Sequence, residues 1–262
     1  MCGFSQPRAV DPTSGHWLAP LTAALDAAPE PVDVFFRDDD GGWEDDRLLT
    51  LLDLFAGLGL PLDVAVIPQA LSPAAAVQLR RRVDAQPELV GLHQHGFAHA
   101  NHEVEGRKQE FGPARSLAEQ RADMAAGRAR LAELLGDAVQ PIFTPPWNRC
   151  TADTAAAARE LGFEVLSREA RAPRFALDGL RELPVSLDWF AKRHGARLTL
   201  DELGALAAEL VRSGAPLGVM LHHAVMDDDE LRAAGELLSV LAGHERVRRW
   251  RLLALARALP AG

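Results

Sequence analysis

The stretch that decides the fold is residues 32–42, which read VDVFFRDDDGG. Its first half, Val32–Phe36, consists of β-branched and aromatic residues apart from Asp33, which is typical of a strand. Three adjacent carboxylates, Asp38, Asp39 and Asp40, follow that strand directly. In parallel α/β proteins the carboxyl ends of the strands carry the functional site, so this stretch predicts both a strand and a site.

The same pattern recurs along the chain, with strand-like runs alternating with stretches of helical periodicity. The further strand-like runs are Leu62–Ile67, Leu89–Leu92, Pro141–Phe143, Phe163–Leu166, Leu183–Leu187 and Leu217–Leu221. The helical stretches are Asp45–Gly57, Pro73–Asp84, Ser116–Leu135, Thr151–Leu161, Leu200–Val211 and Asp228–Leu241. Seven strands alternating with helices predict an α/β fold with a parallel sheet. Periodicity alone leaves a closed barrel and an open sheet both possible.

Composition narrows the class of protein. The 262 residues contain no internal repeat or linker, so we expect one domain over residues 1–262 with its core at about 30–255. The net charge of −9 disfavours a partner such as nucleic acid or an anionic membrane. Two cysteines, Cys2 and Cys150, exclude a disulfide framework. Residues 1–20 lack the apolar segment of an export signal, and no stretch is long enough to span a membrane, so we expect a cytoplasmic protein.

Every unusual polar cluster falls at the end of a predicted strand. These clusters are Asp38–Asp40 after the first strand, His93, His95 and His99 after the third, Thr144–Trp147 after the fourth, Asp188-Trp189 after the sixth and His222-His223 after the seventh. Because parallel strands end at the same edge, we expect these side chains to meet around one site.

The aspartates and histidines together indicate a metal site. Taken alone, the three aspartates are either a solvated helix cap or a metal ligand beside a base. His95 and His99, four residues apart, are either a surface pair or two ligands on one helical turn. Two imidazoles and one carboxylate leave room for water or substrate, as in catalytic sites for divalent metals. Zinc is favoured, and cobalt, nickel, manganese or iron also fit. The same ligand set occurs in non-haem iron oxygenases, but the α/β pattern argues against their β-rich fold.

The motifs in this order resemble the polysaccharide deacetylases, the family 4 carbohydrate esterases with a NodB homology domain. The resemblance runs from Val32 to His223, and its most specific part is residues 92–99, LHQHGFAH. It implies an irregular, TIM-like (β/α)7 barrel. It also implies a hydrolase acting on a carbon–nitrogen bond that is not a peptide bond. Such an enzyme would use metal-activated water to remove the N-acetyl group of a sugar or a related small molecule.

The resemblance also implies roles for individual residues. Asp38 would be the general base, Asp39 would bind the metal with His95 and His99, and His222 would be the general acid. The backbone N–H of Trp147 would stabilise the oxyanion, and Asp188-Trp189 would form the groove wall. Because a third aspartate is present, Asp39 and Asp40 can take the base and ligand roles instead.

Other residues of the predicted site have alternative roles. The family has an arginine before the two prolines, where this chain has Thr144, so Arg149 or Arg37 would have to orient the base. Either His222 or His223 can be the acid; strand alternation puts His222 on the face of Met220. We expect the substrate to be lined by Asp40, His93, His102, Pro146, Trp189 and His223. The alternative function is a catalytically silent, metal-binding barrel that recognises a carbohydrate. The sequence does not decide the oligomeric state.

Overall fold

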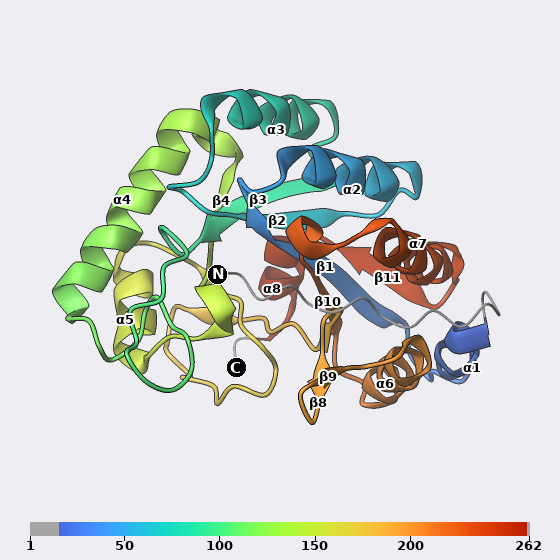
Figure 1. The fold of residues 1–262 in the computed structure, drawn as a ribbon. Coiled ribbons are helices and arrows are strands. Elements are labelled where there is room, and N and C mark those ends of the chain that lie inside the picture. Colours follow the sequence, from blue (N-terminus) through green and yellow to red (C-terminus); the bar gives the residue numbers. More distant parts are fainter. Residues whose placement is uncertain (1–15, 261–262) are drawn as a thin grey trace.

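A parallel sheet forms the centre of the protein, whose computed structural model describes residues 16–260 (Figure 1). The order of hydrogen-bonded strands is β6-β5-β4-β3-β2-β1-β10-β7, and β11 also pairs with β1. The strands are β1 (Val32–Gly41), β2 (Leu62–Val66), β3 (Val90–His95), β4 (Val139–Thr144), β5 (Val165–Leu166), β6 (Arg181–Glu182), β7 (Leu187–Asp188), β10 (Leu217–Leu221) and β11 (Val247–Trp250). A separate antiparallel hairpin joins β8 (Lys192–Arg193) to β9 (Ala196–Arg197).

One extended segment closes the sheet into a barrel. The two ends of the strand order, β6 and β7, both belong to residues 181–188. The first part of this segment pairs with β5, and its last part pairs with β10. The segment therefore acts as one strand, the predicted Leu183–Leu187 strand, and together with β1–β5 and β10 makes seven. The irregular (β/α)7 barrel is confirmed, and the open sheet is excluded.

Helices surround the barrel and follow the expected periodicity closely (Figure 1). The helices are α1 (Ala19–Asp26), α2 (Asp45–Gly57), α3 (Pro73–Ala85), α4 (Leu117–Leu135), α5 (Ala152–Glu160), α6 (Leu200–Arg212), α7 (Asp228–Gly243) and α8 (Leu252–Ala258). Capping boxes at Ser116 and Thr151 begin α4 and α5 where the sequence indicates. Helices α1 and α8 were not predicted, because helices of seven or eight residues depend on packing rather than on propensity.

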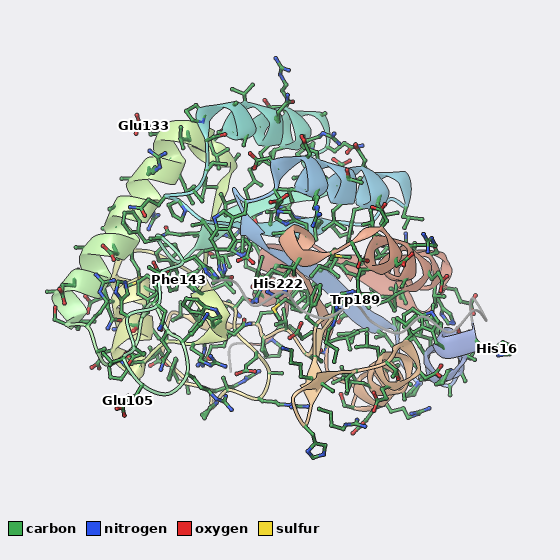
Figure 2. All side chains as sticks on the ribbon, in the orientation of Figure 1. His16, Glu105, Glu133, Phe143, Trp189 and His222 are labelled. Atoms are coloured by element: carbon green, nitrogen blue, oxygen red, sulfur yellow. The ribbon has the colours of Figure 1, made fainter. Side chains whose placement is uncertain are left out.

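The pleat of the strands separates the core into an outer and an inner part. On β1, Val34 and Phe36 pack in the large outer cluster under the helices, whereas Phe35 packs inside the barrel. Figure 2 shows Phe143 toward one side of the molecule and Trp189 toward the other, with His222 between them. The inner cluster also contains residues of α8, which covers the end of the barrel away from the polar clusters.

Helix α8 is held against the barrel by a buried carboxylate. Asp63 of β2 accepts hydrogen bonds from Arg251 Nε at 3.0 Å and from the backbone N–H of Leu252, at the start of α8, at 2.7 Å. Gly91 of β3 lies opposite Asp63, and a Cβ there would collide with the Asp63 carboxylate and the Arg251 guanidinium. A glycine is therefore required at this point of the strand.

None of the helices within residues 16–260 is long and apolar enough to cross a membrane. Of the two cysteines, Cys150 is partly buried, and Cys2 lies outside the described residues.

We predict that Gly91→Ala lowers the free energy of unfolding by about 1–3 kcal/mol, because the new methyl group displaces the Asp63–Arg251 pair. Gly57→Ala is the matched control: nothing lies within 4 Å of a Cβ there, and alanine favours the helix. Urea unfolding of both variants tests this. Equal stability of Gly91→Ala and the wild type would contradict the proposed packing.

Candidate metal and catalytic site

The three adjacent aspartates of β1 point in different directions. Asp38 lies on the outer face with Val34 and Phe36, and accepts hydrogen bonds from His223 Nδ1 at 2.5 Å and from His223 N at 3.0 Å. Asp39 lies on the inner face with Arg37. The register of β1 against β2 shifts between Asp38 and Gly41, and Asp40 has a φ of 72°. This bulge turns the Asp40 carboxylate toward the end of β3.

Asp40, His95 and His99 form a candidate metal centre. Each offers a ligand atom within 4.8 Å of the others. Asp40 Oδ1 lies 3.4 Å from His95 Nε2 and 3.3 Å from His99 Nε2. The structure therefore brings Asp40, rather than Asp39, together with the two histidines, which is the shifted register that the third aspartate allows.

The hydrogen bonds around His95 leave a lone pair directed at a carboxylate. His95 Nδ1 donates to the backbone carbonyl of Thr144 at 3.0 Å, so in the neutral ring Nε2 carries the lone pair that faces Asp40. Asp40 Oδ1 is buried and has no hydrogen-bond partner within residues 16–260. The repulsion between the two lone pairs is relieved either by a proton on His95 Nε2 or by a metal ion between the two atoms. Burial lowers the pKa of His95, but the charges of Asp39 and Asp40 outweigh it and raise the pKa overall. One carboxylate oxygen and two imidazole nitrogens gathered in this way are the donor types that a divalent metal takes, so the donor set fits a metal ion.

His99 is held in a turn rather than on a helix, so the expected helical turn from His95 to His99 is wrong. Its φ is 54°, and Gly96 has the same positive φ. A Cβ at Gly96 would also meet the Glu110 carboxylate and the Pro146 ring, so this turn needs a glycine. Glu110 accepts hydrogen bonds from the backbone N–H groups of Phe97 and Ala98 at 3.2 and 2.7 Å. Burial first, and then the charge of His95, lowers the pKa of His99 to about 4, so the ring is neutral at pH 7.

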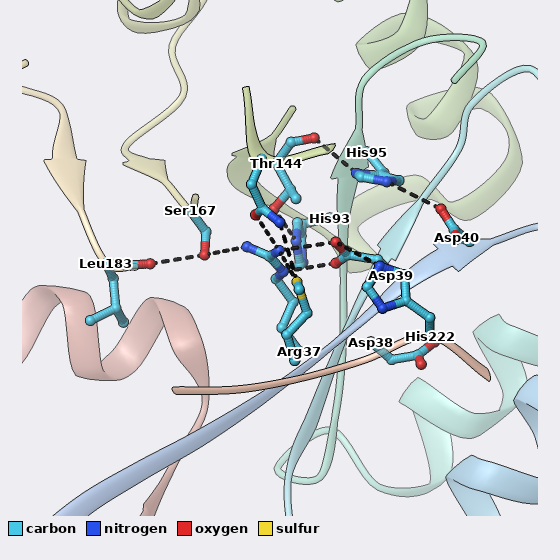
Figure 3. A network of polar contacts seen from close by, with 12 residues as sticks. Arg37, Asp38, Asp39, Asp40, His93, His95, Thr144, Ser167, Leu183 and His222 are labelled. Atoms are coloured by element: carbon cyan, nitrogen blue, oxygen red, sulfur yellow. Dashed lines mark hydrogen bonds and ion pairs between the residues drawn. The ribbon is translucent and has the colours of Figure 1, made fainter. Parts of the chain in front are cut away.

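Arg37 and Asp39 form a buried pair inside the barrel (Figure 3). Arg37 Nε donates to Asp39 Oδ1 at 2.7 Å, and Nη2 donates to Oδ2 at 2.9 Å. Asn148 Oδ1 accepts from Arg37 Nη2 at 2.7 Å, and Ser167 Oγ accepts from Nη1 at 2.8 Å. Burial raises the pKa of Asp39, but Arg37, followed by His95 and His222, lowers it to below its ordinary value. Asp39 is thus a fixed, ionised carboxylate.

A strained turn after β4 supplies Asn148 to this network. Trp147 and Asn148 have φ values of 55° and 59°, in the left-handed region. This turn directs the Asn148 amide inward to Arg37 and places the Trp147 ring 4.5 Å from the His99 ring, centroid to centroid. No acceptor within residues 16–260 takes the Trp147 backbone N–H. Arg149 donates to the carbonyl of Lys108 at 3.2 Å, so Arg37, and not Arg149, contacts Asp39.

The two adjacent histidines after β10 lie on opposite sides of the strand. His223 is buried against Asp38 and also hydrogen-bonds the carbonyl of Trp43 at 2.7 Å. His222 keeps 24% of its side chain exposed, and its Nε2 lies 4.0 Å from Asp39 Oδ2. Because β10 is paired with β1, the first and last parts of the barrel meet at this point.

The remaining predicted residues divide into three groups. Pro146 is buried beside Gly96, and buried His93 hydrogen-bonds the Thr144 hydroxyl at 2.9 Å, so both pack under the residues of the site and neither is exposed to a substrate. Trp189 is fully buried and donates to Glu230 at 2.5 Å, so it is a core residue and the predicted groove wall is wrong at this position. Asp188 accepts from its own turn, at Phe190 N, and His102 contacts Arg115 away from the metal centre.

Three residues near the site were not predicted from the sequence: Asn148, Ser167 and Phe190. The Phe190 ring lies edge-on to the His222 ring at 5.9 Å, and Arg197 covers its other face. Asn148 and Ser167 carried no signal in the sequence, because their function depends on a buried guanidinium that only the folded barrel brings to them.

Solved structures similar to this one are described as polysaccharide deacetylases or as members of carbohydrate esterase family 4. A Mycobacterium smegmatis protein classed with the polysaccharide deacetylases has a TM-score of 0.66 and 17% identity, over 89% of this chain and 92% of its own. A family 4 acetyl xylan esterase from Clostridium thermocellum, in complex with a cobalt ion, has a TM-score of 0.57 and 15% identity, over 87% and 93%. A family 4 pseudoenzyme from Bacillus anthracis has a TM-score of 0.52 and 11% identity, over 84% and 64%. These likenesses establish the NodB-like fold for this chain.

No protein-family profile matches the chain, and no curated protein matches it by sequence.

The His223–Asp38 pair predicts a specific pH dependence of stability. Burial lowers the pKa of His223, but the charge of Asp38 and its hydrogen bond raise it from 6.5 to about 9. A histidine with a raised folded pKa stabilises fully below its unfolded pKa, and this contribution is lost as the pH rises through the folded value. We expect wild-type stability to fall by roughly 2–3 kcal/mol more than that of His223→Asn between pH 6.5 and 9.

Urea unfolding at the two pH values measures this difference. His244→Asn is the control, because His244 pairs with Asp26, a carboxylate whose side chain is 71% exposed, and such pairs contribute little. An identical pH slope in His223→Asn and the wild type would show that the pair does not titrate as described.

Proposed function

We propose that the protein is a metal-dependent deacetylase that hydrolyses the N-acetyl group of a sugar or related small molecule. One observation carries this proposal: the two inner carboxylates are separated, with Asp40 beside two histidines and Asp39 between Arg37 and His222. Hydrolysis of an amide needs a polarised carbonyl, a base and an acid, and this arrangement supports one group for each.

Asp40, His95 and His99 would hold the metal, which replaces the sequence assignment of Asp39. A bound divalent metal supplies Lewis acidity and lowers the pKa of water. The backbone bond from His95 Nδ1 to Thr144 and the neutral state of His99 support this ligand set. The metal itself is to be determined by elemental analysis, with zinc, cobalt, nickel, manganese and iron all compatible with two imidazoles and one carboxylate.

Asp39 would be the general base. Both its oxygens are held by Arg37, which keeps the carboxylate ionised and oriented, and Asn148 and Ser167 hold Arg37 in turn. Arg37 would thus orient the base, a role that the family gives to an arginine at the position where this chain has Thr144. Asp38, which the first of the two sequence assignments made the base, is instead hydrogen-bonded to His223 on the outer face of the strand.

His222 would be the general acid, because it lies beside Asp39 and remains partly exposed. Its Nδ1 is buried without a hydrogen-bond partner within the described residues. An amine leaves poorly unless it is protonated, so a protonated imidazole at this position would assist the departure. The backbone N–H of Trp147, which has no acceptor within the described residues, would donate a hydrogen bond to the negative charge that develops on the acyl oxygen.

Release of acetate from a panel of N-acetyl sugars, with and without a chelator, tests the proposal. We expect acetate release to stop when the chelator is added and to return when divalent metal is restored. Metal binding without acetate release from any substrate would instead favour the catalytically silent barrel; one of the solved structures with this fold is described as a family 4 pseudoenzyme.

We predict that Asp40→Asn and Asp39→Asn fail in different ways. Asp40→Asn loses stoichiometric metal, because it removes the charged ligand of the candidate centre. Asp39→Asn keeps its metal but loses about 10²–10⁴-fold in turnover, because an amide cannot accept the proton. Elemental analysis and acetate release on both variants check this.

Asp46→Asn, an exposed aspartate at the start of α2, serves as the control and should keep both properties. Loss of metal in Asp39→Asn with retention in Asp40→Asn would return the ligand role to Asp39.

We predict that His222→Ala lowers turnover by about 10²-fold or more while retaining metal and fold. His223→Ala should instead lose stability first, because Asp38 is left buried without its partner. Turnover, metal content and unfolding midpoints together separate the two variants. A larger loss of turnover per folded molecule in His223→Ala than in His222→Ala would move the acid to His223.

A further inference from the structure

A cluster of three cationic side chains lies beside the proposed site: Arg107, Lys108 and Arg149. Arg107 and Lys108 are exposed on the segment between β3 and α4, and Arg149 follows the strained turn at Trp147. Arg149 Nη1 donates to the backbone carbonyl of Lys108 at 3.2 Å, which ties the segment to the turn. The cluster is therefore a feature of the fold rather than a set of unrelated surface charges.

One aromatic ring separates this cluster from the proposed metal centre. The ammonium of Lys108 lies 5.9 Å from the centroid of the Trp147 ring, and that ring lies 4.5 Å from the His99 ring. A substrate whose acetamido group reaches His99 would pass along Trp147. Its other end would then approach Lys108.

The three side chains of this cluster form no close ion pair with the described part of the protein. Within residues 16–260, no carboxylate forms an ion pair with Arg107, Lys108 or Arg149, although Arg115 farther along the same segment pairs with Asp123 at 2.6 Å. Arg149 Nε is buried without a hydrogen-bond partner. Burial, followed by the charge of Arg107, lowers the pKa of Arg149, and Glu169 acts in the opposite direction. Three cations gathered beside the proposed site in a chain of net charge −9 would attract an anionic group of a ligand.

We infer that this cluster binds a phosphate group of the substrate, so that the enzyme acts on phosphorylated acetamido sugars. The inference rests on the proposed function and names its substrate class. A guanidinium offers paired donors that fit phosphate oxygens, and an ammonium adds a point charge. A phosphate carries nearly two negative charges at pH 7, enough to compensate two of the three cations.

Calorimetric titration of the metal-loaded protein tests the inference by binding alone. The probes are N-acetylglucosamine, its 1-phosphate, the uridine diphosphate sugar and inorganic phosphate. We expect at least one sugar phosphate to bind ten-fold or more tightly than the neutral sugar, and inorganic phosphate to bind weakly. The better of the two phosphorylated probes tells whether the natural group is a phosphate monoester or a diphosphate linkage.

Variants of the cluster make the test specific. The ratio of affinities for phosphorylated and neutral sugar should fall at least ten-fold in Lys108→Met and in Arg149→Gln, and Lys108→Arg should retain it. Arg232→Gln, which removes an exposed arginine of α7, is the matched control. An unchanged ratio in Lys108→Met and Arg149→Gln would overturn the inference. Inorganic phosphate binding as tightly as the sugar phosphates would also overturn it, because the site would then bind a free ion.

The deacetylase activity and the phosphate subsite can be contradicted independently of each other. Phosphate-dependent binding that needs Lys108, without acetate release, would contradict the deacetylase activity and leave the phosphate subsite supported. Acetate release from neutral and phosphorylated sugars at equal efficiency would support the activity and contradict the subsite.

Discussion

The site depends on a charge buried inside the barrel, that of Arg37. A fully buried guanidinium must be matched by an anion and by hydrogen-bond acceptors, and here Asp39, Asn148 and Ser167 provide them from three different parts of the chain. Because these partners come from β1, from the turn after β4 and from the end of β5, satisfying one side chain fixes the positions of three strand ends. The paired geometry of guanidinium and carboxylate also sets the orientation of Asp39.

Two backbone features then assign different surroundings to three adjacent aspartates. Strand alternation sends Asp38 outward to His223 and Asp39 inward to Arg37. The bulge at Asp40 breaks the alternation, so that a second carboxylate reaches the same edge without sharing the position of the first. Two neighbouring carboxylates would otherwise compete for one site and raise each other's pKa. Their separation is what makes both a ligand and a base available.

Much of the fold could be predicted from local pattern, since helix Asp45–Gly57 and strand Leu217–Leu221 have the expected bounds. The position of the site at the carboxyl ends of the strands was also predictable. The choice between Asp39 and Asp40 was not, because it depends on a register shift against β2 that leaves no trace in the sequence. The His95–His99 spacing suggested a helical turn, but a glycine with positive φ and the buried Glu110 carboxylate impose a different turn. Trp189 was predicted as a groove residue from its place after a strand. Its burial against Glu230 depends on the tertiary structure, so the sequence could not indicate it.

The most direct test of the central claim is the position of the metal in a crystal of the protein grown with zinc or cobalt, located by anomalous scattering at the metal's absorption edge. We predict a peak at about 2.0–2.2 Å from one Asp40 oxygen, His95 Nε2 and His99 Nε2, with both Asp39 oxygens still held by Arg37. A peak bonded to Asp39, with Arg37 displaced from that carboxylate, would contradict the assignment of the base and the ligand.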